Sequence, residues 1–215
     1  MYNTDRIAHA YFFAKNYIIS KGYGNEVDWQ QELNYDKITE QKFLNEISWV
    51  ILASGMNDKV VRKVFPIIKN IMFDFKSSDL IQKNKTRCYN NSLKVFNHKG
   101  KISAIIYVAE YIKLHTFDEV SSRIMKEGIG FIQTFPYMGK ATSFHLAKNI
   151  GLDYAKPDRH LIRISNSLGY NTPNDLCKVI SNRIQEKKSL IDLVLWRYAT
   201  LDKNYIRNLN WFIAH

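Results

Sequence analysis

The stretch FIQTFPYMGKATSFHLAKNIGLDYAKPDRHLIRI, residues 131–164, contains three predicted helices and the breaks between them. Pro136 fixes one backbone angle and Gly139 lets another backbone approach closely, so a tight turn is expected here. A helix is expected to begin near Lys140, and another at Asp158 after a loop. The stretch therefore predicts a helix, a tight turn, a helix, a loop and a final helix.

The turn before Lys140 is suited to holding a phosphate. The helix that follows it opens with free backbone amides at Gly139, Lys140 and Ala141. These amides, the helix dipole and the charge of Lys140 would attract an anion. A turn of this kind can grip a nucleic-acid backbone without reading the base sequence.

Helical periodicity also dominates the rest of the chain. Two segments carry apolar residues on one helical face, namely Phe43, Ile47, Val50 and Ile51 with Ser54, and Ile102, Ile105, Ile106, Ala109 and Ile112. No convincing alternating pattern of a strand is present. The periodicity therefore predicts an all-α fold with about ten helices.

Capping signals agree with this prediction. Thr116 followed by Glu119 predicts a capping box, and Thr172, Pro173 and Asp175 predict an N-cap, a first-turn proline and a first-turn acid.

The composition indicates a folded protein with an anionic partner. Hydrophobic residues make up 46% of the 215 residues, and 31 Lys and Arg stand against 20 Asp and Glu, a formal charge of +11. Such an excess favours nucleic acid or an anionic membrane surface, although a lysine-rich protein without such a partner has the same charge. No apolar run reaches the length of a membrane span and no signal-peptide pattern is present, so we expect a cytoplasmic protein with no membrane association.

The turn and the later aspartate resemble the helix-hairpin-helix (HhH-GPD) DNA glycosylase superfamily, which includes endonuclease III and the adenine and 8-oxoguanine glycosylases. The family hairpin usually reads LPGVGxKTA and is followed by an aspartate that opens a helix. This sequence has FPYMGKATS at residues 135–143, and then Asp158 within KPDRHL. The resemblance implies a two-lobed helical fold: a central lobe at 38–152 with the helix-hairpin-helix at about 129–150, and a second lobe at 1–37 plus 153–215.

The resemblance also implies the chemistry. Asp158 would be the catalytic carboxylate of a DNA glycosylase, which excises a damaged or modified base by hydrolysing the N-glycosidic bond after base flipping, as in base excision repair. An aspartate at a helix start is often only an N-cap, and Asp158 could do both. The residues expected to contact double-stranded DNA around the hairpin and the aspartate are Pro136, Met138, Gly139, Lys140, Ala141, Thr142 and Arg159.

A second segment, FLNEISWVILASGMNDKVVRKVF at residues 43–65, resembles the helix, wedge loop and helix of the same family. Gly55 stands where the family has a glutamine, so Met56 or Asn57 would fill the space left by the displaced base. The alternative is an ordinary interhelical turn with Asp58 as the N-cap.

Three departures from the family pattern matter. Tyr137 replaces the first hairpin glycine, at a cost of about 1 kcal/mol if the position is left-handed. The nucleophilic lysine of bifunctional members aligns with Ala141, one position after Lys140, which favours a monofunctional hydrolase. The alternatives are strand nicking through an imine on Lys140, and a non-catalytic DNA-binding module. The third departure is that the cysteines of an iron–sulfur cluster are missing, since the chain has only Cys88 and Cys177.

We expect no cofactor and no iron–sulfur cluster, although the hairpin could hold a monovalent cation, and we expect a monomer. Further basic residues expected to line the DNA strand are Lys148, Lys156 and Arg163, each of which could instead be a solvated surface charge. The identity of the excised base stays open, with oxidised guanine, alkylated purine and deaminated base all among the candidates.

Overall fold

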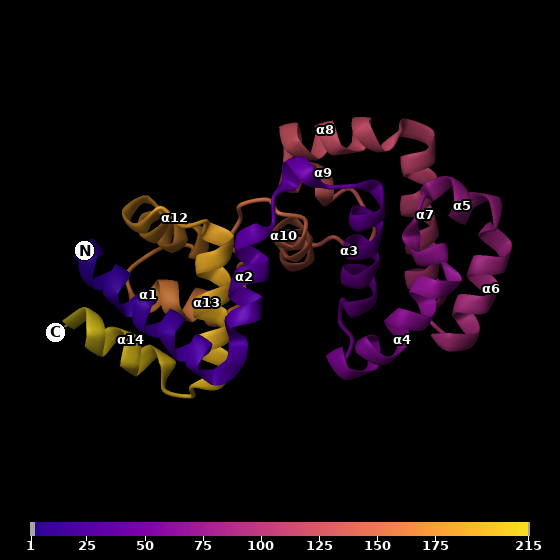
Figure 1. The fold of residues 1–215 in the computed structure, drawn as a ribbon. Coiled ribbons are helices and arrows are strands. Elements are labelled where there is room, and N and C mark those ends of the chain that lie inside the picture. Colours follow the sequence, from indigo (N-terminus) through magenta and orange to yellow (C-terminus); the bar gives the residue numbers. More distant parts are fainter. Residues whose placement is uncertain (1–2, 215) are drawn as a thin grey trace. The chain divides into compact units, whose positions relative to one another are not determined.

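The computed structural model describes residues 3–214, and within them all regular secondary structure is helical, in fourteen α-helices with short π and 3-10 turns and no strand (Figure 1). This confirms the predicted all-α class. This number is higher than the roughly ten helices predicted, because several helices, such as α5 (Ser78–Lys83) and α9 (Ile129–Ile132), are only one or two turns long. The chain divides into two compact units: unit 1 comprises Met1–Asn34 and Gly151–His215, and unit 2 comprises Tyr35–Ile150.

Unit 1 is built from both ends of the chain around helix α13 (Lys188–Leu201), which packs against α1, α2, α11, α12 and α14. Its other elements are α1 (Thr4–Ile18), η1 (Ile19–Tyr23), α2 (Gly24–Glu32), α11 (Arg159–Ser167), α12 (Pro173–Ile184) and α14 (Tyr205–Ala214). Aromatic rings fill the core, where Tyr198 meets Phe13 and Tyr17 edge to face.

Unit 2 is centred on α3 (Glu40–Ala53) and α7 (Lys99–His115), which pack against each other. The two apolar faces predicted from periodicity are confirmed, because every one of their apolar residues is buried. The remaining elements are η2 (Tyr35–Lys37), α4 (Asp58–Ile71), η3 (Phe73–Phe75), α5, α6 (Lys85–Val95), α8 (Phe117–Glu127), α9 and α10 (Lys140–Asn149).

The helix starts follow the capping signals at two predicted positions. The Thr116 hydroxyl accepts from the amide of Glu119 at 3.4 Å, and the Thr172 hydroxyl accepts from the amide of Asp175 at 3.1 Å. Both predicted N-caps are confirmed, and each stabilises its helix by about 1 kcal/mol.

The N-cap of α4 differs from the one named in the alternative of an ordinary interhelical turn. Asn57, rather than Asp58, is the cap, and its side chain accepts from the amide of Lys59 at 2.9 Å. Asp58 is already the first helical residue and forms an ion pair with Arg62 at 2.6 Å, one turn further on. Asn and Asp cap helices equally well, so the sequence alone favours neither residue.

No helix among residues 3–214 combines the length and the apolar character that crossing a bilayer demands.

Candidate active site

The turn between α9 and α10 is anchored in the core of unit 2. The side chain of Phe135 is buried, and its ring contacts those of Phe43, Tyr111 and Phe131 at centroid distances of 5.4 to 6.2 Å. Met138 is only 3% exposed. Its side chain therefore packs into the core, and the DNA contact that the sequence predicts for Met138 would have to come from its backbone.

The amides that follow this turn are open to a ligand. Gly139 is the N-cap of α10 and has no side chain to bond the first helical amides. Gly139, Lys140 and Ala141 are all exposed, and Pro136 is half-buried. The local geometry therefore suits the anion-binding role that the sequence predicts for this helix start.

Tyr137, which stands where the family hairpin has its first glycine, has a left-handed backbone with φ of 64°. A residue with a side chain pays about 1 kcal/mol for this conformation. The turn is closed around it by the hydroxyl of Thr142, which donates to the Tyr137 carbonyl at 2.7 Å. The Thr142 side chain is thus occupied within the turn.

The loop between α3 and α4 contains the two candidate wedge residues. Gly55 has a positive φ of 67°, which turns the chain sharply after α3. Met56 follows it with a side chain that is 36% exposed. Asn57 is exposed too, but its side-chain oxygen caps α4. Of the two candidates, Met56 is the one whose side chain has no capping role.

Asp158 is the N-cap of α11 in unit 1 and is partly exposed. Its Oδ1 accepts from the amides of His160 at 2.8 Å and Leu161 at 2.9 Å. Both of these bonds use Oδ1, so the cap does not require Oδ2. The carboxylate can therefore hold the helix start with one oxygen and present the other to a ligand.

The loop before Asp158 is tied to α13 by two acids. Asp192, which is 1% exposed, accepts from the amide of Lys156 at 3.1 Å, and Asp153 accepts from the amide of Ser189 at 2.9 Å. The amide of Asp158 in turn donates to the carbonyl of Lys156 at 2.9 Å. Sequence reasoning missed Asp192, although an acid inside the apolar run SLIDLVLW signals a buried acceptor with a structural task.

The side chain of His160 supports the helix start. Its Nδ1 lies 3.4 Å from the hydroxyl of Tyr205, and the two rings meet edge to face at 5.6 Å. The neighbouring Arg159 is exposed.

The three further basic residues, Lys148, Lys156 and Arg163, differ in their exposure to solvent. Arg163 is exposed and Lys156 is half-buried. Lys148 is only 8% exposed, on the last turn of α10 among buried neighbours. The expectation that Lys148 lines a DNA strand as an exposed surface charge is wrong, because its side chain is buried.

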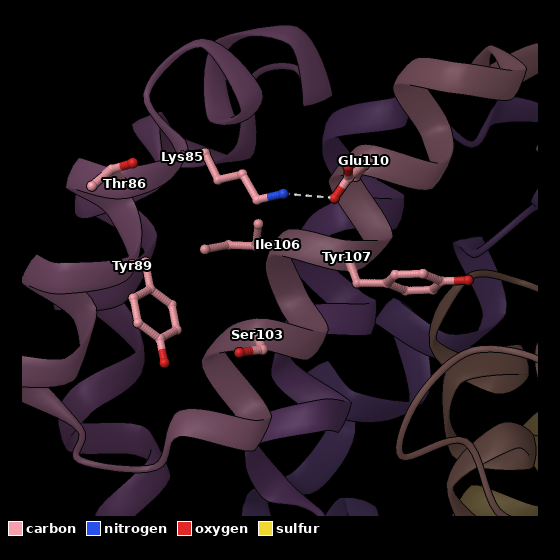
Figure 2. A pocket seen from close by; sticks show the side chains of 7 residues that line it. All are labelled: Lys85, Thr86, Tyr89, Ser103, Ile106, Tyr107 and Glu110. Carbon is pink, nitrogen blue, oxygen red and sulfur yellow. Dashed lines mark hydrogen bonds and ion pairs between the residues drawn. The ribbon is translucent and has the colours of Figure 1, made fainter.

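A separate pocket of about 420 Å³ lies on unit 2 between α6 and α7. It is lined by Lys85, Thr86, Tyr89, Ser103, Ile106, Tyr107 and Glu110, and Figure 2 shows the Lys85–Glu110 ion pair, 2.8 Å long, joining the two helices. None of the catalytic or DNA-binding residues predicted from the sequence lines this pocket. Among residues 3–214, no group of three His, Cys, Asp or Glu side chains is arranged to hold a metal ion.

The structure thus presents an all-α chain with an open helix start after a tight turn in unit 2, and a carboxylate at a helix start in unit 1. The chain is 27% identical over 180 residues to a protein of Sulfolobus acidocaldarius described as an 8-oxoguanine DNA glycosylase/AP lyase. The alignment covers 75% of this chain and 83% of that relative. No protein-family model matches the chain, and no solved structure matches it.

Proposed function

We propose that this protein is a DNA glycosylase that removes a damaged or modified base from double-stranded DNA, as the first step of base excision repair. The observation that carries the proposal is the similarity, over three quarters of the chain, to a protein described as an 8-oxoguanine DNA glycosylase/AP lyase. Two local features support it, each within its own unit: Asp158 is the N-cap of α11, and α10 begins after a tight turn with no side-chain cap.

The proposed chemistry assigns Asp158 the catalytic role. As the bond between base and sugar breaks, positive charge develops at C1′ and at the ring oxygen of the sugar. A carboxylate close to these atoms stabilises that charge or takes a proton from the attacking water. The base leaves with the bonding electrons and accepts a proton, while the water oxygen bonds to C1′. The Oδ2 atom of Asp158 is the oxygen we assign to this step, since Oδ1 holds the helix cap.

Binding is assigned to the loops of unit 2. The open amides at Gly139, Lys140 and Ala141 would hold a phosphate of the DNA backbone, and Met56 would enter the space left by the flipped base. Most of the excess of Lys and Arg over Asp and Glu lies in unit 2, which favours a polyanion there. We expect a monomer that needs no iron–sulfur cluster.

A second candidate is a bifunctional enzyme that also nicks the strand. The relative's description includes AP lyase, and Lys140 is an exposed amine at the first residue of α10. In this reaction the Lys140 amine loses a proton and displaces the base at C1′. The bond between C1′ and the ring oxygen then breaks, the ring oxygen takes up a proton, and the imine forms between C1′ and the lysine nitrogen. Loss of a proton from C2′ then expels the 3′ phosphate and breaks the strand. The alignment of Ala141, rather than Lys140, with the family lysine favours simple hydrolysis instead.

The test uses duplexes that carry 8-oxoguanine, an alkylated purine or a deaminated base, incubated with purified protein with and without alkali. The 8-oxoguanine duplex comes first because the relative's description names that base. Cleavage only after alkali marks a hydrolase. Direct nicking, together with a borohydride-trapped adduct that is lost in Lys140→Gln, marks the lyase.

Lys99→Gln is the matched control, because Lys99 is also an exposed lysine at the first residue of a helix in unit 2. Binding without excision of any base would identify a non-catalytic module. If the folded protein neither binds the duplexes nor excises a base from them, the proposal is refuted.

A further inference from the structure

Lys101 is a buried lysine in the first turn of α7, in unit 2. Its side chain is 2% exposed. The Nζ atom donates to the carbonyl oxygens of Ile51, of Leu52 at 3.0 Å and of Ser54 at 2.6 Å. An ammonium group has three N–H bonds, so these carbonyls use all of them.

The three carbonyls belong to the end of α3 and to its C-cap, Ser54. The last carbonyls of a helix have no partner within the helix and carry the negative end of its dipole. They therefore offset part of the cost of burying an ammonium group. Burial itself lowers the pKa of Lys101 below its usual value. Lys101 thus fixes the point where the chain leaves α3 and enters the loop at residues 54–57.

Lys101 also contacts the turn that precedes α10. Its Nζ lies 4.9 Å from the centre of the Tyr137 ring, within the range of a cation–π interaction. The same ring meets that of His98 edge to face at 6.3 Å. A Cβ atom at Gly100 would lie only 2.6 Å from the Tyr137 hydroxyl, so the phenol rests against the backbone of α7.

We infer that Lys101 is a positioning residue which, through Tyr137, braces the loop at residues 54–57 against the turn at residues 133–139. The inference deepens the proposed function and rests on it, because these are the two elements of unit 2 assigned to DNA. The brace also accounts for a tyrosine at a left-handed position, since a glycine there would offer no ring to Lys101.

A brace of this kind acts on binding. Loops held at a fixed spacing before DNA arrives lose less conformational freedom when it binds. Loss of the Lys101–Tyr137 contact should therefore raise the Kd for a duplex with an abasic-site analogue by about three- to thirtyfold. A merely structural defect would instead reduce the active fraction and leave the Kd of the folded protein unchanged.

Two substitutions test the brace. Lys101→Met removes the ammonium group directly. Gly100→Ala is the second variant, in case Lys101→Met does not fold, because its methyl group displaces the Tyr137 ring while alanine favours the helix. Gly24→Ala is the matched control, since Gly24 is also helical and a Cβ there meets nothing within 4 Å.

The readouts are amide hydrogen exchange in the free protein and the Kd for the abasic-analogue duplex. Lys101→Met and Gly100→Ala should speed exchange at residues 54–57 and at residues 135–139 together and raise the Kd, whereas Gly24→Ala should change neither. Tyr137→Phe keeps the ring and should keep wild-type exchange, whereas Tyr137→Leu should not.

The inference is overturned if Gly100→Ala and Tyr137→Leu exchange like the wild type at both loops, whatever the protein does to DNA. If exchange responds at both loops but the wild-type protein neither binds nor cleaves the duplexes, the brace stands and the proposed function fails.

Discussion

Replacing Asp158 by Asn separates its role in capping α11 from its proposed role in catalysis. An asparagine side chain keeps an oxygen that can accept from the amides of His160 and Leu161, now at 2.8 and 2.9 Å. Asn and Asp are equivalent N-caps, so the free energy of unfolding should change by less than about 0.5 kcal/mol. The negative charge, however, is gone. Loss of one electrostatic contribution to a transition state lowers the rate by about 10²- to 10³-fold, which is the decrease we expect in base excision.

Asp158→Ala is the companion variant, because it removes both roles. Loss of an N-cap costs about 1 kcal/mol, or about 2–4 °C in Tm for a chain of this length. The assay is single-turnover excision on the duplex that the wild type cuts best, with a thermal melt of each variant. Wild-type excision by Asp158→Asn would refute the catalytic role and leave Asp158 as a cap. An equal loss of Tm in both variants would show that the activity lost with Asn reflects a damaged helix.

Three further predictions concern other residues. Met56→Ala should weaken binding to an abasic-analogue duplex in a titration while leaving the Tm unchanged, because the side chain is 36% exposed; unchanged affinity would exclude Met56 as the wedge. Asp192→Ala leaves the Lys156 amide without its acceptor and should lower the free energy of unfolding in urea by about 1–3 kcal/mol, whereas Asp192→Asn, which keeps an acceptor, should lose less. Burial raises the pKa of Tyr198 from 10.0 to about 12, so the phenol stays protonated to a higher pH in the folded protein than in the unfolded chain. The free energy of unfolding should therefore fall as the pH rises from 10 to 12, more shallowly in Tyr198→Phe, and equal slopes in the two proteins would contradict this account.

Much of the fold could be predicted from local sequence. The apolar faces of α3 and α7 follow helical periodicity, and Thr116 and Thr172 cap helices because their hydroxyl groups can reach amides three residues ahead. Asp158 could be identified in the same way, since it follows Pro157 and precedes an amphipathic helix.

The features that escaped prediction depend on tertiary contacts. Lysine is usually exposed, so the sequence predicts an exposed Lys148 and does not indicate that Lys101 is buried. Lys101 is buried because its ammonium group donates to the carbonyls at the end of α3, about 50 residues earlier in the chain. Met138 was expected beside a ligand because of its place in the motif, but apolar packing turns its side chain inward.

The enclosure of Lys101 gives unit 2 a natural chemical reporter. An ammonium group that donates all three of its hydrogens to carbonyl oxygens has no free electron pair, and at 2% exposure no acylating reagent can reach it. Surface amines such as those of Lys99 and Lys140 should react at once, whereas acetylation of Lys101 should require α3 and α7 to separate. Mass spectrometry of its peptide after a timed pulse of reagent would then count the molecules in which this core has opened.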